Sequence, residues 1–180
     1  MRLNKSALLF AAVVAAAGLA GSPASASTSA LDLPAGALTI VEVGTDAMGS
    51  DTWANRNREF VTFKVTGGAP VDVDGLVVQD NWSKNNTNPH TCNKYTVTGL
   101  PGQGSAAMLQ PGETVTVFNG SRWGGNYKNG TEYRLYAKSD VDCGASGHFL
   151  NNDADSVWLT SGATQVASKS WDWNGGYTVN

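Results

Sequence analysis

Hydrophobic and polar residues alternate over short stretches along most of the chain. In the segment 59–65, Val61, Phe63 and Val65 would share one face and the polar residues between them the other, which is typical of a half-buried antiparallel strand. From residue 27 onward, no stretch carries hydrophobic residues at helical spacing over three turns. The pattern therefore predicts a domain that is almost entirely β.

About eight or nine strands are predicted, separated by polar turns. They are the segments 38–43, 59–65, 71–74, 76–80, 95–98, 114–118, 132–137, 156–160 and 164–173. Asn119-Gly120 and Asn129-Gly130 are strong turn signals because both residue types tolerate positive φ, and the polar run 81–94 is expected to be a long loop. This spacing of turns is typical of a β-sandwich or a β-barrel and not of a parallel sheet.

The first 26 residues follow a different pattern. Arg2 and Lys5 precede an unbroken apolar run over residues 7–20, and the small residues Ala24-Ser25-Ala26 follow it. This order is typical of a secretory signal peptide that is cleaved after the small residues, and the run is shorter than the roughly 20 apolar residues of a membrane-spanning helix. We therefore expect residues 1–26 to be a signal peptide and the mature protein to be secreted.

The mature chain is expected to be one domain. Residues 27–36 are predicted to form a mobile terminus and residues 37–180 a single β-domain, because 180 residues suffice for about one domain. No second apolar run of membrane-spanning length is predicted. The formal net charge is −3, and loss of the two basic residues of the leader makes the mature chain more acidic, which argues against a basic face that binds nucleic acid.

Export gives a role to the two cysteines, Cys92 and Cys143. An oxidising compartment favours a disulfide between them. Closing the chain between residues 92 and 143 into a loop would contribute roughly 4 kcal/mol to the free energy of unfolding. The alternatives are two unpaired buried thiols or a zinc site with His90 and His148. Both are less favoured, because the cysteines lie in polar sequence and lack the close paired spacing of zinc modules.

Three blocks of sequence occur in a characteristic order: 57–65 with 69–76, then Leu-Gln-Pro-Gly-Glu at 109–113, then 149–159 with its Leu-Asn-Asn and acidic residues before an apolar strand. Together they resemble the lamin tail domain. The resemblance covers about residues 37–173, nearly the whole mature chain.

This resemblance implies an immunoglobulin-like antiparallel β-sandwich. It also implies a non-enzymatic binding or scaffolding module, because the family consists mostly of adaptors, and it transfers no catalytic residue and no cofactor. The implied partner is an exported protein or a component of the cell envelope.

Catalytic chemistry has little support in the sequence, and we expect no enzyme. There is no G-x-S-x-G motif around a nucleophilic serine. The alternative is an exported hydrolase with an unrecognised carboxylate site. Asp140 with Asp142 and Asp153 with Asp155 place carboxylates at alternate positions of extended segments, which makes them weak candidates for calcium; no metal site is predicted.

Aromatic residues in polar loops suggest the second binding function. Trp82 and, in a glycine-rich segment, Trp123 and Tyr127 would be exposed rings that can stack on sugars. Carbohydrate binding is therefore the alternative to protein binding, with polysaccharide as the partner and Trp123 as the strongest candidate. Trp171 and Trp173 would form a second such platform.

Overall fold

The computed structural model describes residues 32–45, 55–85, 93–104, 106–137, 150, 154–172 and 178–179. Within these ranges the chain forms twelve β-strands, one short α-helix, α1 (Asn81–Asn85), and one 3-10 helix, η1 (Arg56–Arg58). The predicted all-β class is confirmed.

The described strands form three sheets. The six-stranded sheet has the order β12 (Thr178–Val179), β1 (Leu38–Gly44), β2 (Phe60–Val65), β7 (Thr114–Phe118), β9 (Glu132–Tyr136) and β8 (Tyr127–Asn129). The four-stranded sheet has the order β11 (Thr164–Trp171), β10 (Asp155–Ser161), β4 (Val77–Asp80) and β5 (Lys94–Thr96). A short pair joins β3 (Val71–Asp72) to β6 (Met108–Leu109).

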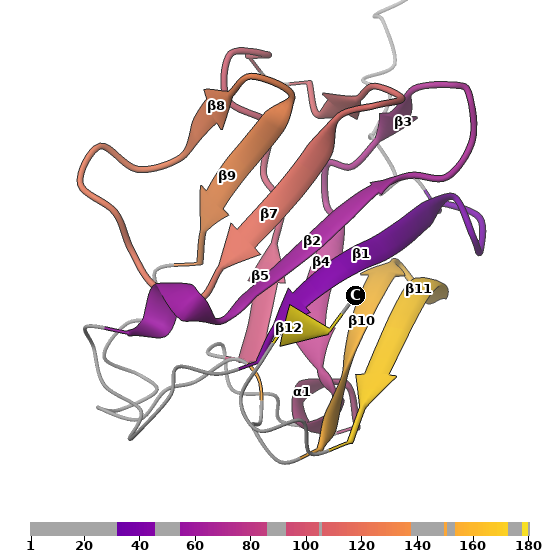
Figure 1. Cartoon of the computed structure of the whole chain (residues 1–180). Coiled ribbons are helices and arrows are strands. Elements are labelled where there is room, and N and C mark those ends of the chain that lie inside the picture. The colour runs from indigo at the N-terminus through magenta and orange to yellow at the C-terminus, as the bar shows by residue number, and fades with distance from the viewer. Residues whose placement is uncertain are drawn as a thin grey trace, which may run out of the picture.

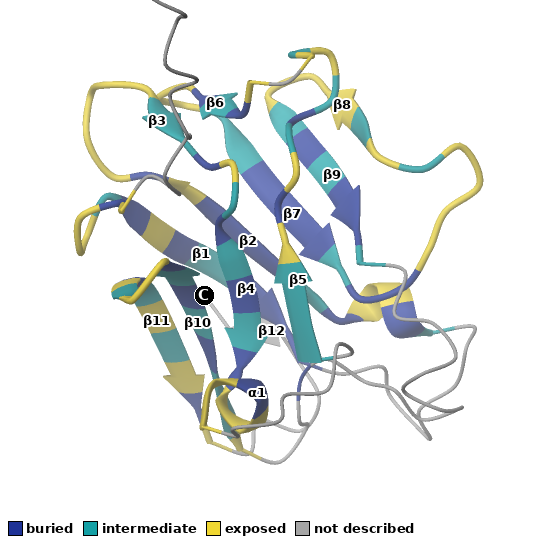
Figure 2. Ribbon diagram, turned by 180° about the vertical axis from the view of Figure 1, so that it is seen from behind, coloured by how far each residue is buried: buried dark blue, intermediate teal, exposed yellow. Residues whose placement is uncertain are grey.

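The two larger sheets form two layers, as Figures 1 and 2 show from opposite sides. Both sheets contribute residues to a single hydrophobic core. In β2, Val61, Phe63 and Val65 are buried and Lys64 is exposed, as predicted, but Thr62 on the predicted polar face is buried as well and pairs with the Thr116 hydroxyl. Leu159 of β10 is likewise fully buried, from the other layer.

Two features of the sheets differ from the sequence prediction. The described residues form twelve strands and not eight or nine, because β6, β8 and β12 were not predicted; each is only two or three residues long, too short to show an alternating pattern. The pairing is also not antiparallel throughout, because β7 and β9 run in parallel, from Thr114 opposite Glu132 to Phe118 opposite Tyr136.

The parallel pair results from the path of the chain after β7. The chain crosses to the edge of the sheet, runs back as β8, turns at Gly130 and returns as β9 in the gap between β7 and β8. The connection 119–126 must therefore cross two strand spacings, about 9.5 Å. It extends away from the strands in Figure 1 and is mostly exposed in Figure 2.

The sequence predicted that the polar run 81–94 is one long loop, and this prediction is wrong. The first five residues of the run form α1, because the Asp80 carboxylate accepts a hydrogen bond from the backbone N–H of Ser83 at 2.6 Å. An aspartate in this place is a favourable N-terminal cap for a helix. The run ends in β5, which begins at Lys94.

Contacts of the domain begin before residue 37. Leu33 is buried, and its N–H donates to the Ser161 hydroxyl at 3.2 Å. The N–H of Gly36 donates to the carbonyl of Val166 at 2.8 Å. Part of the segment 27–36 therefore packs against β10 and β11.

Two predictions fall on residues outside the described ranges. The signal peptide, 1–26, is one of them, and the disulfide between Cys92 and Cys143 is the other. Both stay predictions. In the part of the chain that the structure describes, no helix has the length and apolar character needed to cross a membrane.

Candidate functional site

Trp123 lies at the tip of the connection between β7 and β8, and its side chain is 98% exposed. The N–H of Gly125 donates to the carbonyl of Arg122 at 3.0 Å, which closes a four-residue β-turn, here named the Trp123 turn (Arg122–Gly125). Gly124, its third residue, has a φ of 89°, as that position of a type II turn requires. The glycine after the tryptophan thus permits the turn that exposes the indole.

The connection is fixed where it leaves β7. Asn119 is fully buried, and its Nδ2 donates to Glu59 Oε2 at 2.8 Å. Asn57 Nδ2 donates to the carbonyl of Ser121 at 2.9 Å. These bonds attach the first residues of the connection to the segment before β2.

The connection is fixed again where it enters β8. Asn126 Oδ1 accepts a hydrogen bond from the backbone N–H of Tyr136 at 2.9 Å. The Arg122 guanidinium lies 3.9 Å from the centroid of the Tyr127 ring, within the range of a cation–π contact. Trp123 therefore projects from a loop with a defined path, so the backbone of this loop has little conformational freedom left to lose on binding.

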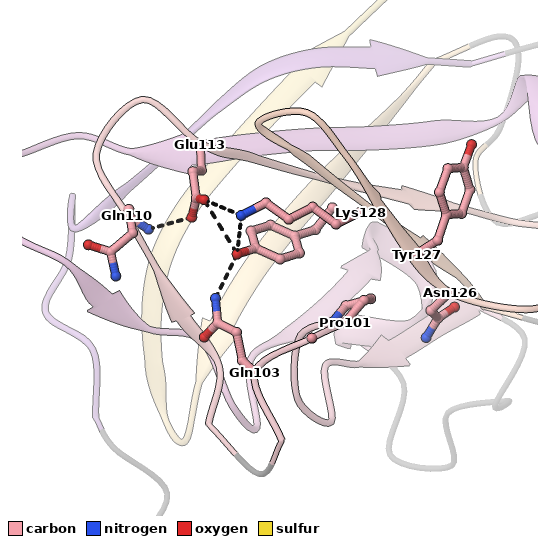
Figure 3. A pocket seen from close by; sticks show the side chains of 9 residues that line it. Pro101, Gln103, Gln110, Glu113, Asn126, Tyr127 and Lys128 are labelled. Carbon is pink, nitrogen blue, oxygen red and sulfur yellow. Dashed lines mark hydrogen bonds and ion pairs between the residues drawn. The ribbon is translucent and has the colours of Figure 1, made fainter.

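A shallow, open depression of about 680 Å³ lies next to this loop. Its lining residues are Pro101, Gly102, Gln103, Gln110, Glu113, Asn126, Tyr127, Lys128 and Tyr133. Figure 3 shows Gln110 and Glu113 on one side of it and Asn126 and Tyr127 on the other. The depression thus begins at the residues that directly follow the Trp123 turn.

Four side chains form a hydrogen-bonded network in the depression (Figure 3). Lys128 Nζ lies 2.6 Å from Glu113 Oε1 and donates to the Tyr133 hydroxyl at 2.8 Å. Gln103 Nε2 donates to the same hydroxyl at 2.7 Å. Because Glu113 and Lys128 are the only charged lining residues, the lining has no net formal charge.

The two charged groups are both held in their ionised forms. Burial raises the pKa of Glu113, but the hydrogen bonds from Lys128 and the Gln110 N–H outweigh burial and leave this pKa below its ordinary value. The hydrogen bonds to Glu113 and Tyr133 raise the pKa of Lys128. Neither group is therefore suited to exchange protons near neutral pH.

Of the predicted aromatic candidates, Trp123 and Tyr127 belong to one segment of the chain, at the β7–β8 connection and the start of β8, whereas Trp82 lies elsewhere. Trp82 lies in α1 and is 43% exposed, and α1 lies away from β8 in both Figure 1 and Figure 2. Tyr127 is half-buried, and one of its ring faces is already covered by Arg122. Trp123 is the aromatic ring that is open to solvent.

The tryptophans that follow β9 in the sequence are arranged differently. Trp171 is buried in the core, so it forms no exposed platform, and Trp173 lies outside the described residues. Trp158 lies between the buried Val157 and Leu159 of β10 and is therefore on the outer face of the four-stranded sheet. There, Lys84 Nζ lies 3.7 Å from the centroid of its ring.

A buried carboxyl group that the sequence did not reveal lies in the same layer. Asp80 is 4% exposed, and its carboxylate accepts hydrogen bonds from the Ser83 N–H at 2.6 Å and from Asn93 Nδ2 at 2.5 Å. Burial, the largest effect, raises the pKa of Asp80 to about 6, and the negative charge of Asp155 adds to this rise. A carboxyl group with such a pKa can exchange protons near neutral pH.

The calcium prediction is largely outside the described part of the chain. Asp140, Asp142 and Asp153 lie outside the described residues, and of the four candidates only Asp155 is described. Among the described residues, no group of three or more His, Cys, Asp or Glu side chains is arranged to hold a metal ion. The calcium candidates therefore gain no support.

Sequence reasoning missed the network of Gln103, Glu113, Lys128 and Tyr133. Lys128 and Tyr133 are opposite each other in the β8–β9 hairpin, so the turn signal at Asn129-Gly130 contained the information to pair them. The other two residues come from connections before β6 and β7. Nothing local in the sequence places these loop residues beside the hairpin.

Comparison with known proteins gives no assignment, since no family model and no curated protein matches this chain. The similarity to the lamin tail domain therefore rests on the three blocks of sequence alone. The function has to be argued from the geometry of the site.

Proposed function

We propose that the protein is a secreted, non-enzymatic binding module of the lamin-tail type. Its partner is an exported protein or a component of the cell envelope, and the Trp123 turn is its binding surface. The observation that carries the proposal is the 98% exposure of Trp123 on a connection that is fixed at both ends. A tryptophan buries about 150–250 Å² when it is covered, so covering this one against a partner is favourable.

The immunoglobulin-like sandwich implied by the lamin tail resemblance fits this role. Its support in the structure is the pair of layers that share one core (Figure 1). In domains of this architecture, loops at the rim of the sandwich bind partners while the sheets stay rigid. The connection 119–126 is such a loop, and the edge strand β8 continues it.

A non-enzymatic role is supported by the state of the polar groups next to Trp123. Glu113, Lys128, Gln103 and Tyr133 are hydrogen-bonded to one another, and the pKa shifts of Glu113 and Lys128 both favour the charged forms. A general acid or base would need a pKa near the working pH. The network is suited to holding the depression in shape.

A second candidate function, an exported hydrolase, is favoured by one observation. The pKa of Asp80 is raised to about 6, with Asp155 close enough to contribute, and pairs of carboxyl groups perform acid–base catalysis in hydrolases. The hydrogen bonds that Asp80 accepts from Ser83 and Asn93 give it a structural role in capping α1, which is why we rank this candidate second. Loss of a purified hydrolase activity in Asp80→Asn would establish it.

Affinity capture from secreted and cell-envelope fractions tests the leading proposal. The wild-type protein should retain a specific component, Trp123→Ala should lose it, and Trp82→Ala should retain it. Trp82→Ala is the matched control because it removes the other large exposed hydrophobic side chain of the described chain. Melting temperatures of all three proteins show that the variants are folded.

Two results would contradict the proposal. One is equal capture by wild type and Trp123→Ala, which would place binding on another surface. The other is the absence of any specific component from both fractions, which would leave the module without a partner.

A further inference from the structure

Trp123 has surroundings that differ from those of a protein–protein contact. The only large exposed hydrophobic side chains of the described chain are Trp82 and Trp123, and the neighbours of Trp123 are Ser121, Arg122 and Gly124. Residues that dominate protein–protein affinity lie within an apolar, well-packed patch that excludes water. A single exposed indole whose sequence neighbours are polar or glycine provides no such patch on its own.

The depression next to the Trp123 turn offers amides and paired charges. Gln110 and Asn126 are exposed, and each primary amide carries two donor hydrogens and an acceptor oxygen with two lone pairs. The Asn126 amide already binds the Tyr136 N–H and the Tyr95 side chain, so only part of its capacity is left for the hydroxyl groups of a ligand. The charge of Lys128 is compensated by Glu113, and that of Arg134 in β9 by Glu132 at 2.6 Å. The depression is therefore suited to an uncharged ligand rich in hydroxyl groups, while Arg122 of the Trp123 turn, whose guanidinium lies over the Tyr127 ring, leaves one positive charge beside it.

The two features lie close enough to contact one ligand. Trp123 and Tyr127 are four residues apart, so their Cα atoms are separated by at most about 14 Å. Tyr127 lines the depression. A short stretch of a linear polymer can therefore cover the indole and reach into the depression.

Building on the proposed binding function, we propose that the ligand is an uncharged polysaccharide of β-linked pyranoses in the gluco configuration. The hydroxyl groups of such a sugar are equatorial, so the ring faces carry C–H groups. One face stacks on the indole of Trp123, as apolar surface does on an aromatic platform. The hydroxyl groups of a neighbouring sugar bind the Gln110 and Asn126 amides in the depression.

Retention on insoluble polysaccharide is the direct test. Purified wild-type protein is incubated with cellulose, with chitin, and with the anionic polymer pectate as a control, and soluble oligosaccharides of the retained polymer are then titrated by calorimetry. We expect retention on at least one of the uncharged polymers and none on pectate. Trp123→Ala should weaken binding by about tenfold or more, the equivalent of losing one stacking contact.

Further variants separate the stacking contact from the polar contacts. Trp123→Phe keeps an aromatic ring and should bind more tightly than Trp123→Ala. Gln110→Ala should weaken binding by about two- to fivefold, the cost of one exposed hydrogen bond. Trp82→Ala should bind as the wild type does, and raising the salt concentration should have little effect, because the contacts are uncharged.

The outcomes distinguish this inference from the proposed function. Absence of retention on cellulose and chitin, or retention that Trp123→Ala leaves unchanged, overturns the polysaccharide assignment. If Trp123-dependent capture then delivers an exported protein free of glycan, the binding function stands and only its ligand class is wrong. If the protein binds neither a polysaccharide nor any component of the secreted and cell-envelope fractions, both proposals are wrong.

Discussion

The two exposed tryptophans of the described chain, Trp123 and Trp82, show how different two solvent-facing aromatic residues can be. Both were predicted to be exposed from the same sequence signal, a tryptophan in a polar segment. Trp123 is almost completely exposed on a turn beyond the edge of a sheet, whereas Trp82 is 43% exposed on a one-turn helix that contacts β10. Partial exposure of this second kind is common for large side chains at the surface of folded proteins.

What distinguishes the two regions is the structure beneath each ring. The Trp123 turn is attached through Asn119 and Asn126 and borders a depression with its own hydrogen-bonded network. α1 begins with the cap from Asp80, a carboxylate whose burial is unfavourable in its charged form. The first region is built to hold an exposed ring in place, and the second builds a helix next to a titratable group.

The largest expected effect comes from removing the support of the Trp123 turn. Glu59 is fully buried, binds Asn119 Nδ2 and the Leu150 N–H, and offsets part of the effect of burial on the pKa of Arg56, which remains lowered. Glu59→Ala leaves these groups without their acceptor, which should lower the free energy of unfolding by about 3 kcal/mol. Chemical denaturation measures this loss.

Glu59→Gln is the control for that variant. Its side-chain carbonyl can still accept the hydrogen bond from Asn119, so it should be less destabilised than Glu59→Ala. If the two variants are equally stable, the hydrogen bond to Asn119 does not support the connection. Glu59→Ala should also weaken binding at Trp123 more than Glu59→Gln does.

The second prediction concerns the pH dependence of the α1 region. Since the pKa of Asp80 is raised to about 6 in the folded protein, above its ordinary value of 3.8, the folded state binds this proton more tightly than the unfolded state. Asp80 therefore makes stability fall as the pH rises from about 4 to 6, by at most about 1.4 kcal/mol per pH unit. Above that window both states are ionised and its contribution is constant.

Asp80→Asn isolates this contribution. The variant retains a side-chain oxygen to cap α1 but has no titrating carboxyl, so the difference in stability between variant and wild type should grow in favour of the variant from pH 4 to pH 6. Urea denaturation at several pH values measures it. A constant difference across this range would show that the pKa of Asp80 is not raised. The α1 region would then not differ from the Trp123 region in having a carboxyl group that titrates near neutral pH.

The contrast also shows how far the sequence could predict the molecule. The burial of Val61, Phe63 and Val65 and the strand 114–118 were predictable, because a period of two in hydrophobicity is a local property. The parallel pairing of β7 and β9 was not, because it depends on how the chain crosses the sheet edge. Exposure of Trp123 was predictable from its glycine neighbours.

The depression and the environment of Asp80 were beyond prediction for the same physical reason. Gln103 reaches Tyr133 across thirty residues of sequence, and Asp155 acts on Asp80 from a strand that is adjacent only in the sheet. In the sequence, Asp80 is the last residue of a predicted strand. Its role as a helix cap was not predicted, because the residues after it were expected to form a loop. Sites that depend on pairing between distant segments leave no local pattern.

A smaller effect is expected from changing the Trp123 turn itself. Gly124→Ala introduces a side chain at a φ of 89°, where a residue with a Cβ is strained by about 1 kcal/mol. Because nothing lies within 4 Å of the added Cβ, the strain is conformational and not steric. The variant should be stable but should hold Trp123 less well, so its loss of binding should exceed its loss of stability.

The smallest effect is expected at Trp82, and it completes the comparison. Trp82→Ala removes a ring that is more than half covered, so it should cost stability by about 1 kcal/mol, whereas Trp123→Ala removes an almost fully exposed ring and should leave the melting temperature unchanged. Binding should respond in the opposite way, with Trp123→Ala defective and Trp82→Ala intact. Thermal melts and binding titrations on the same two variants measure both quantities. If Trp82→Ala lost binding and Trp123→Ala did not, the binding surface would lie around α1 and the Trp123 turn would not contact the ligand.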